Sequence, residues 1–394
     1  FQVQVEAKSH CKSCNTVEQM VTIEIEYDNC WDLPLLETTS LYRIKEKLHL
    51  QGSTAVQECS IRQLYLTRKN GFSQTCFSFS FFCTLFAELP PDYPSVPIRG
   101  LAGSVRMPLI GLGTWQYNNT VAEQAVIDAF NLGYRHVDTA ADYGNQVGVG
   151  QALAKTGLDR KEFFITTKIP AANASATKAA LAQALVELQT SYVDLMLIHF
   201  PSSVKSERKE QWLALEEWAR QGHARAIGVS HYCRAHVEEV LSFASLPVAV
   251  NQNQYHVGMG TDTQKRLHDK AFMESHGILF EAYSSLCGPC TPPANTELIN
   301  GPLVSGIGAN HNKTGAQVAL RWVVQNNIPV IPKSSNPKHL ASNFQIFDFK
   351  LTDQEMAKLT AATSPAETGT PQHPDDAQDC DFETSNNFQF IERL

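Results

Sequence analysis

The sequence predicts an α/β fold in which eight strands alternate with helices and close into a parallel (β/α)8 barrel. Apolar runs rich in β-branched residues recur along the chain, as in 163–167 and 193–198, and helical patterns separate them. Each run ends at a polar or aromatic residue. Because the carboxyl ends of parallel strands meet on one face of such a barrel, these residues predict a single functional rim.

The elements follow in chain order. The expected strands end near Trp115, Asp138, Lys168, His199, Ser230, Gln252, Tyr283 and Lys333. The expected helices cover Val121–Leu132, Thr177–Leu188, Lys209–Gln221 and Thr314–Gln325, with a last helix near Thr352–Thr360. We expect the barrel to span 96–382 and a tail to follow over 383–394. The proline-rich segment Pro90–Pro97 is interpreted as a linker.

Residues 1–95 contain no motif that indicates a family. Val21–Tyr27 alternates apolar and polar residues, as a half-buried strand does, and 41–50 and 60–67 are weaker strand candidates. Two interpretations stay open. The region is a small β-rich module, or it is in part a gene-model artefact, because 72–86 is mostly Phe, Ser, Cys, Thr and Leu, which a translated pyrimidine-rich stretch encodes.

Charge and composition narrow the function classes. The net charge of −8 and the sequence pI of about 5.9 argue against a nucleic-acid-binding protein. No apolar run approaches the ~20 residues that cross a membrane. These observations predict a soluble globular protein. We also expect it to be monomeric and cytoplasmic and to act on a small molecule.

Cysteine placement leaves one alternative. Six of the ten cysteines precede residue 84, so they form either a disulfide framework, which would place the chain in the secretory pathway, or a set of reduced thiols. Cys287 and Cys290 have redox-pair spacing but do not precede a helix, which disfavours a redox role. No His/Cys cluster has the spacing of a metal site, so we expect no metal.

Four rim residues have the chemistry of a carbonyl reductase: Asp138, Tyr143, Lys168 and His199. A tyrosine has a reference pKa of about 10 and is a poor acid at neutral pH unless a nearby cation stabilises its anion. Lys168 is expected to supply that cation and Asp138 to hold it, while His199 orients a carbonyl oxygen. Taken singly, each has a structural explanation; the combination favours catalysis.

The motifs around these residues resemble those of aldo-keto reductases from about 105 to 382. They are Gly111–Trp115, Gly133–Ala140, Asp142–Asn145, Lys168, Ile198–Pro201, Gly228–Ser230, Asn251-Gln252, Tyr283-Ser284 and Ile331–Ser334. The resemblance implies NADPH-dependent reduction of an aldehyde or ketone to an alcohol, with Tyr143 as general acid and NADH as an alternative cofactor. The competing hypothesis is a nucleotide-binding regulatory or scaffold protein on the same fold, with little turnover.

The resemblance also assigns the cofactor residues, since no Gly-x-Gly-x-x-Gly fingerprint follows a strand. It implies that Tyr283 stacks on the nicotinamide, that Ser230 and Gln252 bind its carboxamide, and that the backbone at Ser284 and Leu286 contacts the pyrophosphate. The 2′-phosphate and adenine side comprises Lys333, Ser334, Asn336, His339 and Asn343. Trp115 and Phe200 are the implied substrate-pocket residues, which favours an apolar or aromatic carbonyl compound.

Three positions depart from the family pattern. His231 replaces an asparagine at the carboxamide, His339 replaces an arginine at the 2′-phosphate, and Ser342 replaces a glutamate at the adenine. A neutral histidine lacks the bidentate donor of a guanidinium. We therefore expect weaker NADPH binding and a looser preference over NADH.

Overall fold

The computed structural model describes residues 93–259, 270–287 and 296–363, together with three short strands nearer the N-terminus. The chain divides into two compact units, Phe1–Ala87 and Glu88–Leu394. The expected tail over 383–394 and the residues after 363 lie outside the described part of the chain.

In the first unit the described strands form one antiparallel sheet in the order β1-β2-β3. They are β1 (Val3–Ala7), β2 (Met20–Ile25) and β3 (Phe79–Phe82). The second of them covers most of the strand predicted over Val21–Tyr27. The weaker strands expected over 41–50 and 60–67 lie outside the described residues.

The second unit is built on a parallel sheet of seven strands that follow one another in chain order. They are β6 (Leu112–Gly113), β7 (His136–Asp138), β8 (Phe164–Ile169), β9 (Val193–Ile198), β10 (Ala224–Ser230), β11 (Val250–Gln254) and β12 (Leu279–Tyr283). Every residue of β8 and β9 is buried, because parallel strands of this kind are covered on both faces. The sequence of β9 is apolar apart from Asp194, whereas β8 also buries Thr166, Thr167 and Lys168.

The segment around Val330 closes the sheet into a barrel. Val330 forms parallel bridges to Ile110, just before β6, and to Ala282 of β12. Its carbonyl accepts from the Gly111 amide at 2.8 Å, and the Ala282 amide donates to Pro329 at 2.8 Å. The eighth strand predicted to end near Lys333 is therefore a short extended segment that joins both sheet edges, and the barrel prediction is confirmed.

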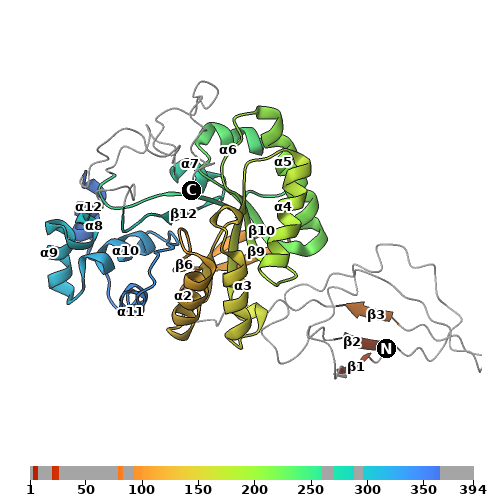
Figure 1. The fold of residues 1–394 in the computed structure, drawn as a ribbon, viewed down its shortest axis with the longest axis horizontal. Coiled ribbons are helices and arrows are strands. Elements are labelled where there is room, and N and C mark those ends of the chain that lie inside the picture. Colours follow the sequence, from red (N-terminus) through yellow and green to blue (C-terminus); the bar gives the residue numbers. More distant parts are fainter. Residues whose placement is uncertain are drawn as a thin grey trace, which may run out of the picture. The chain divides into compact units, whose positions relative to one another are not determined.

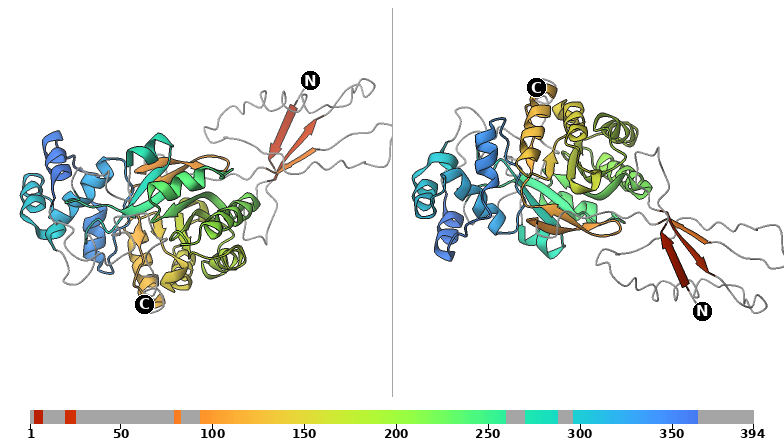
Figure 2. Two further views of the ribbon diagram at one scale, coloured as in Figure 1. Left: turned by 90° about the horizontal axis from the view of Figure 1, so that it is seen from above. Right: turned by 90° about the horizontal axis from the view of Figure 1, so that it is seen from below.

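Helices surround the strands of this unit (Figures 1 and 2). The α-helices are α2 (Asn119–Asn131), α3 (Gln146–Lys155), α4 (Ala174–Glu187), α5 (Lys205–Trp218), α6 (Arg234–Leu241), α7 (Lys270–Ser275), α8 (Glu297–Asn300), α9 (Pro302–His311), α10 (Gly315–Gln325), α11 (Pro337–Phe344) and α12 (Asp353–Ala361). Short helical turns form η1 (Ala141–Tyr143), η2 (Arg160–Glu162) and η3 (Ala219–His223).

All five predicted helices form, with ends shifted by a few residues. Side-chain caps set several of their starts: Asn118 accepts from the Val121 amide at α2, and Thr314 with Gln317 makes a capping box at α10. The helix predicted over Lys209–Gln221 differs from its prediction at both ends. It begins earlier, at Lys205, and passes after Trp218 into the π-turn η3.

A hairpin not anticipated from the sequence closes the amino-terminal end of the barrel. It consists of β4 (Ser95–Gly100) and β5 (Gly103–Pro108), paired antiparallel. Its buried side chains and buried side chains in or next to strands β8 to β11 make up the floor cluster: Val96, Ile98, Val105, Met107, Phe164, Leu195, Leu197, Ala226, Ala249 and Val250. The linker interpretation is therefore wrong for Ser95–Pro97, which belong to β4. The opposite, carboxyl-terminal end carries the rim.

Candidate active site

The four catalytic candidates meet at the carboxyl-terminal end of neighbouring strands. Asp138 is the last residue of β7, and Lys168 lies one residue from the end of β8. Tyr143 ends the turn η1 that follows β7, and His199 directly follows β9. Parallel pairing of β7 with β8 and of β8 with β9 brings these strand ends side by side.

The Lys168 ammonium is at the centre of this group. Its Nζ donates to Asp138 Oδ1 at 2.6 Å, to the Thr139 carbonyl at 3.1 Å and to the Tyr143 hydroxyl at 3.3 Å. The Lys168 side chain is fully buried and that of Asp138 is 2 % exposed. Three acceptors therefore use the three N–H donors of the ammonium, and one of those acceptors is the candidate acid.

At this centre burial and the neighbouring charges shift the pKa values of Lys168 and Tyr143 in opposite directions. Burial disfavours the charge on Lys168, but Asp138, Tyr143 and Glu281 together outweigh that effect and raise the pKa of Lys168. Burial raises the pKa of Tyr143 to about 12, although Lys168 acts to lower it. The effect expected of Lys168 on the tyrosine has the predicted direction, but burial exceeds it. Tyr143 therefore stays protonated over the neutral range.

His199 contacts an acid that sequence reasoning missed. Its Nδ1 lies 3.0 Å from Asp142 Oδ2, and its ring meets the Tyr143 ring edge-on with 5.6 Å between the centroids. Burial raises the pKa of Asp142, an effect that Lys168 partly offsets. Asp142 immediately precedes Tyr143 in η1, and that adjacency was the signal available in the sequence.

Ser230 and His231, at the end of β10, form a fixed hydrogen-bonded group. His231 Nδ1 lies 2.8 Å from Ser230 Oγ and 2.8 Å from the His199 carbonyl, which can only accept, so Nδ1 carries a proton. Ser230 Oγ in turn donates to the Gln252 carbonyl at 2.9 Å. The backbone of His231 has φ 61°, a left-handed conformation that His shares with Asn as an enriched residue.

The aromatic side chains of this rim form a continuous series of neighbouring rings. The centroids of His199 and Phe200 are 4.3 Å apart, those of Phe200 and His231 are 4.1 Å apart, and those of His231 and Tyr283 are 5.1 Å apart. The series links the candidate substrate residue Phe200 to the candidate nicotinamide platform Tyr283. It therefore joins the two halves of the site that the sequence predicted separately.

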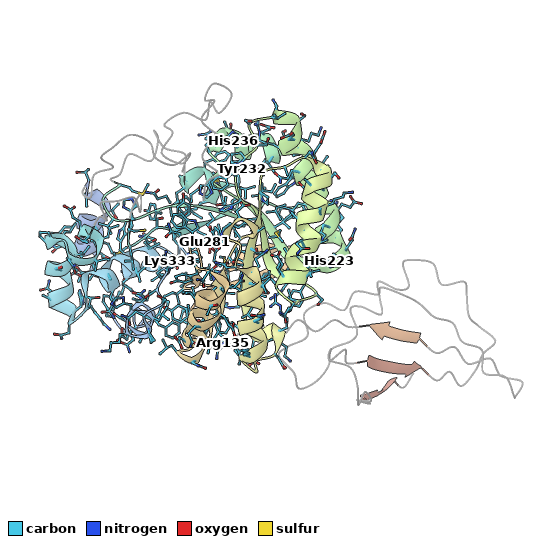
Figure 3. All side chains as sticks on the ribbon, viewed as in Figure 1. Arg135, His223, Tyr232, His236, Glu281 and Lys333 are labelled. Carbon is cyan, nitrogen blue, oxygen red and sulfur yellow. The ribbon has the colours of Figure 1, made fainter. Side chains whose placement is uncertain are left out.

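Gln252 lies between two carboxyl groups. Its Nε2 donates to Asp138 Oδ2 and to Glu281 Oε2, each at 2.8 Å. Glu281 is in β12, is fully buried, and is labelled in Figure 3. Sequence reasoning assigned Gln252 to the site but missed Glu281. Tyr283, two residues further along β12, has a buried hydroxyl without a hydrogen-bond partner.

The candidate phosphate residues lie before and on α11. Lys333 Nζ donates to Gln116 Oε1 at 2.8 Å and stands 5.8 Å and 5.4 Å from the ring centroids of Trp115 and Tyr117. Partial burial lowers the pKa of Lys333. The contact joins the loop after β6 to the segment that closes the barrel.

The remaining cofactor candidates lie next to or on α11 and directly after β12. Ser334 Oγ accepts from the Asn336 amide, and Asn336 Oδ1 accepts from the Lys338 amide at the start of α11. On α11 itself His339 is exposed and Asn343 is buried. Ser284, directly after β12, has a left-handed backbone with φ 58°, and Leu286 packs against the barrel core.

The described residues show neither a metal centre nor a membrane-spanning helix. Among the described residues no group of three or more His, Cys, Asp or Glu side chains is placed to hold a metal ion. Within that same part of the chain, none of the helices has the length and apolar character needed to cross a membrane. The expectation that Cys287 and Cys290 have no redox role stays a prediction, because 288–290 lie outside the described residues.

Comparison with known proteins places this geometry in a family. The aldo/keto reductase family matches residues 109–364. The chain is 38 % identical over 272 residues to a glyoxal reductase of Bacillus subtilis, covering 68 % of this chain and 94 % of that protein. It is 33 % identical over 303 residues to a morphine 6-dehydrogenase of Pseudomonas putida, covering 75 % and 98 %.

Solved structures agree with these relatives. A Bombyx mori aldo-keto reductase in complex with NADP has a TM-score of 0.61 and 28 % identity, covering 70 % of this chain and 92 % of that one. An aldose reductase from Schistosoma japonicum has a TM-score of 0.62 and 26 % identity, covering 76 % and 100 %. The chain belongs to the aldo/keto reductase family of oxidoreductases.

Proposed function

We propose that this protein reduces an aldehyde or ketone to an alcohol with NADPH, and that Tyr143 is the general acid. The observation that carries the proposal is the buried contact of the Lys168 ammonium with both Asp138 and the Tyr143 hydroxyl. A proton donor with a cation beside it, at the carboxyl ends of barrel strands, is the arrangement that carbonyl reduction requires.

The residues of the rim fit the cofactor. Tyr283 offers a ring beside His231, Gln252 and Ser230 offer amide and hydroxyl atoms for a carboxamide, and Lys333 offers a cation for a phosphate. When bound, NADPH supplies the hydride that goes to the carbonyl carbon. The bound NADP of the Bombyx mori relative supports the same cofactor class here.

The chain's own residues complete the reaction. His199 orients the carbonyl oxygen, and the Tyr143 O–H bond breaks as its proton passes to that oxygen. The Lys168 ammonium, 3.3 Å from the hydroxyl, stabilises the resulting tyrosinate until a proton from solvent restores it. Asp138 keeps the ammonium charged and in place. The carbon gains a hydride and the oxygen a proton, which gives the alcohol.

Phe200 and Trp115 support an apolar or aromatic substrate, since both present large rings at the rim. The direct test is consumption of NADPH with an aromatic aldehyde under steady-state conditions. Turnover supports a reductase. Tight nucleotide binding without turnover would favour the nucleotide-binding regulatory or scaffold protein instead, a hypothesis for which the replacements at His231, His339 and Ser342 are the sequence argument.

The preference for NADPH over NADH, the monomeric state and the cytoplasmic location stay predictions. His339 and Ser342 support a weaker preference for NADPH than the family pattern implies, since neither provides a bidentate donor or a carboxylate. Dissociation constants for both nucleotides and the mass of the protein in solution would settle the first two.

A further inference from the structure

Glu281 points into the barrel beneath the rim. Side chains alternate along a strand, and in β12 the flanking Phe280 and Ala282 belong to the outer core between strands and helices, while Leu279 packs on the floor cluster. Glu281 therefore shares the inner face with Leu279 and with Tyr283. Its side chain is fully buried, and its Oε1 has no hydrogen-bond partner.

The contacts of Gln252 fix the direction of its amide. Both N–H groups of its Nε2 are taken, one by Asp138 Oδ2 and one by Glu281 Oε2. An ionised Asp138 can only accept, so the nitrogen and not the oxygen of the amide faces the carboxyl groups. The Oε1 atom of Gln252 is consequently directed away from Asp138 and Glu281.

We propose that Glu281 is a positioning residue for the cofactor: together with Asp138 it anchors both N–H groups of Gln252, so that Gln252 presents Oε1 to the NH2 of the nicotinamide carboxamide. The inference rests on the proposed function, because it needs the nicotinamide to lie at Tyr283. It assigns Glu281 no contact with substrate or cofactor; the residue acts through Gln252.

The charge state of Glu281 agrees with this role. Burial and the nearby Asp138 carboxylate raise the pKa of Glu281 to about 8, and the Lys168 ammonium opposes that rise. At neutral pH the group is therefore mostly a neutral acid, whose carbonyl oxygen still accepts from Gln252. A glutamine at this position keeps that acceptor and the same volume, whereas leucine removes the acceptor.

Binding of NADPH, measured by quenching of intrinsic fluorescence, tests the proposal without relying on turnover. We expect Glu281→Leu to raise the dissociation constant about five- to tenfold, the loss of one oriented hydrogen bond. Glu281→Gln should restore binding to within about twofold of the parent chain, because its amide oxygen replaces the acceptor. Thermal unfolding of each variant checks that the barrel is intact.

A double-mutant cycle separates positioning from a general structural role. If Glu281 acts through Gln252, then Glu281→Leu added to Gln252→Leu should weaken NADPH binding no further than Gln252→Leu alone. Additive losses, or unchanged binding in folded Glu281→Leu, would overturn the proposal. A parent chain that binds no NADPH would refute the proposed function as well, whereas a parent that binds and reduces while Glu281→Leu is unaffected would refute this inference alone.

Discussion

Lys168 and Asp138 form an ion pair with 2.6 Å between Nζ and Oδ1, inside the barrel and almost entirely shielded from water. A buried pair of this kind is not a strong source of stability, because desolvation offsets the attraction. The ion pair serves instead to hold the Lys168 ammonium in place. The ammonium cannot leave Asp138 without a large penalty, so it stays within 3.3 Å of the Tyr143 hydroxyl.

Removing the cation should therefore damage both stability and chemistry. Lys168→Met leaves Asp138 as a buried unpaired charge, which costs about 3–5 kcal/mol of unfolding free energy, and it leaves Tyr143 without its cation. The double variant Lys168→Met with Asp138→Asn should regain most of that stability but no reductase activity. Urea unfolding and NADPH consumption measure the two effects. Activity in the stabilised double variant would show that the cation is dispensable.

Removing only the proton donor should affect only the chemistry. Tyr143→Phe should lower the reduction rate by about 10²–10⁴-fold, the usual loss on removing a general acid, while NADPH still binds. Tyr192→Phe is the matched control, because Tyr192 directly precedes β9 at the other end of the barrel and should keep full activity. Tyr143→Phe turnover within a few-fold of the parent would exclude Tyr143 as the acid.

The Asp142–His199 contact predicts a pH effect. With Nδ1 donating to an Asp142 carboxylate, His199 can offer Nε2–H to a carbonyl only if the ring carries a second proton or Asp142 is protonated. Burial raises the pKa of Asp142, so the shared proton persists to higher pH than for an ordinary aspartate and is lost as pH rises.

Reduction should accordingly slow as pH rises across the neutral range, and Asp142→Ala should flatten that decline by freeing the His199 tautomer. The pKa of Tyr143 near 12 keeps tyrosine ionisation out of this range. Rates with one aldehyde across the range decide the matter. Parallel profiles for the parent and Asp142→Ala would mean that the contact does not govern the histidine.

Cofactor preference should respond to residue 339. His339→Arg adds a bidentate donor on α11, the helix that follows Lys333 in the chain, and should tighten NADPH binding about tenfold, the value of a charge-assisted hydrogen bond, with NADH nearly unchanged. His223→Arg is the charge control, because His223 immediately precedes β10 at the amino-terminal end of the barrel. If both variants change NADPH affinity equally, net charge and not a phosphate contact is responsible.

The hairpin of β4 and β5 determines how much of the N-terminal region can be removed. A chain beginning at Glu88 keeps β4, β5 and every rim candidate, so we expect it to fold and to reduce aldehydes as the full chain does. A chain beginning at Leu109 lacks the hairpin and uncovers apolar side chains such as Phe164 and Leu195, which should lower its melting temperature or prevent folding. Loss of activity in a folded chain from Glu88 would give the first unit a part in the site.

The sequence predicted the barrel because several strands are apolar runs directly followed by a polar residue, as Val193–Ile198 is followed by His199. It did not predict β4, because Pro94 and Pro97 favoured a linker. The signal was nevertheless present: Val96 and Ile98 alternate with Pro97 and Arg99, the period of a strand buried on one face. Proline in an edge strand concealed it.

Within the site, strand order and family motifs were enough to propose Asp138, Tyr143, Lys168 and His199. Glu281 could not be found in that way. Its role depends on Gln252, whose other partner Asp138 is 114 residues away in the chain, and no local pattern encodes a contact of that separation. The direction in which the pKa of Tyr143 shifts could not be predicted from the sequence either. Burial raises that pKa, and burial is known only from the fold.

The floor cluster has a consequence for how such a protein diversifies. The apolar side chains that hold β4 and β5 against the strand starts are at one end of the barrel, while the loops that carry Trp115 and Phe200 are at the other. Substitutions in those loops therefore leave the anchoring side chains untouched, and variants with new substrate preferences can arise without a matching loss of foldability. Libraries confined to the loops should be rich in folded members, which makes this chain a suitable starting point for directed evolution.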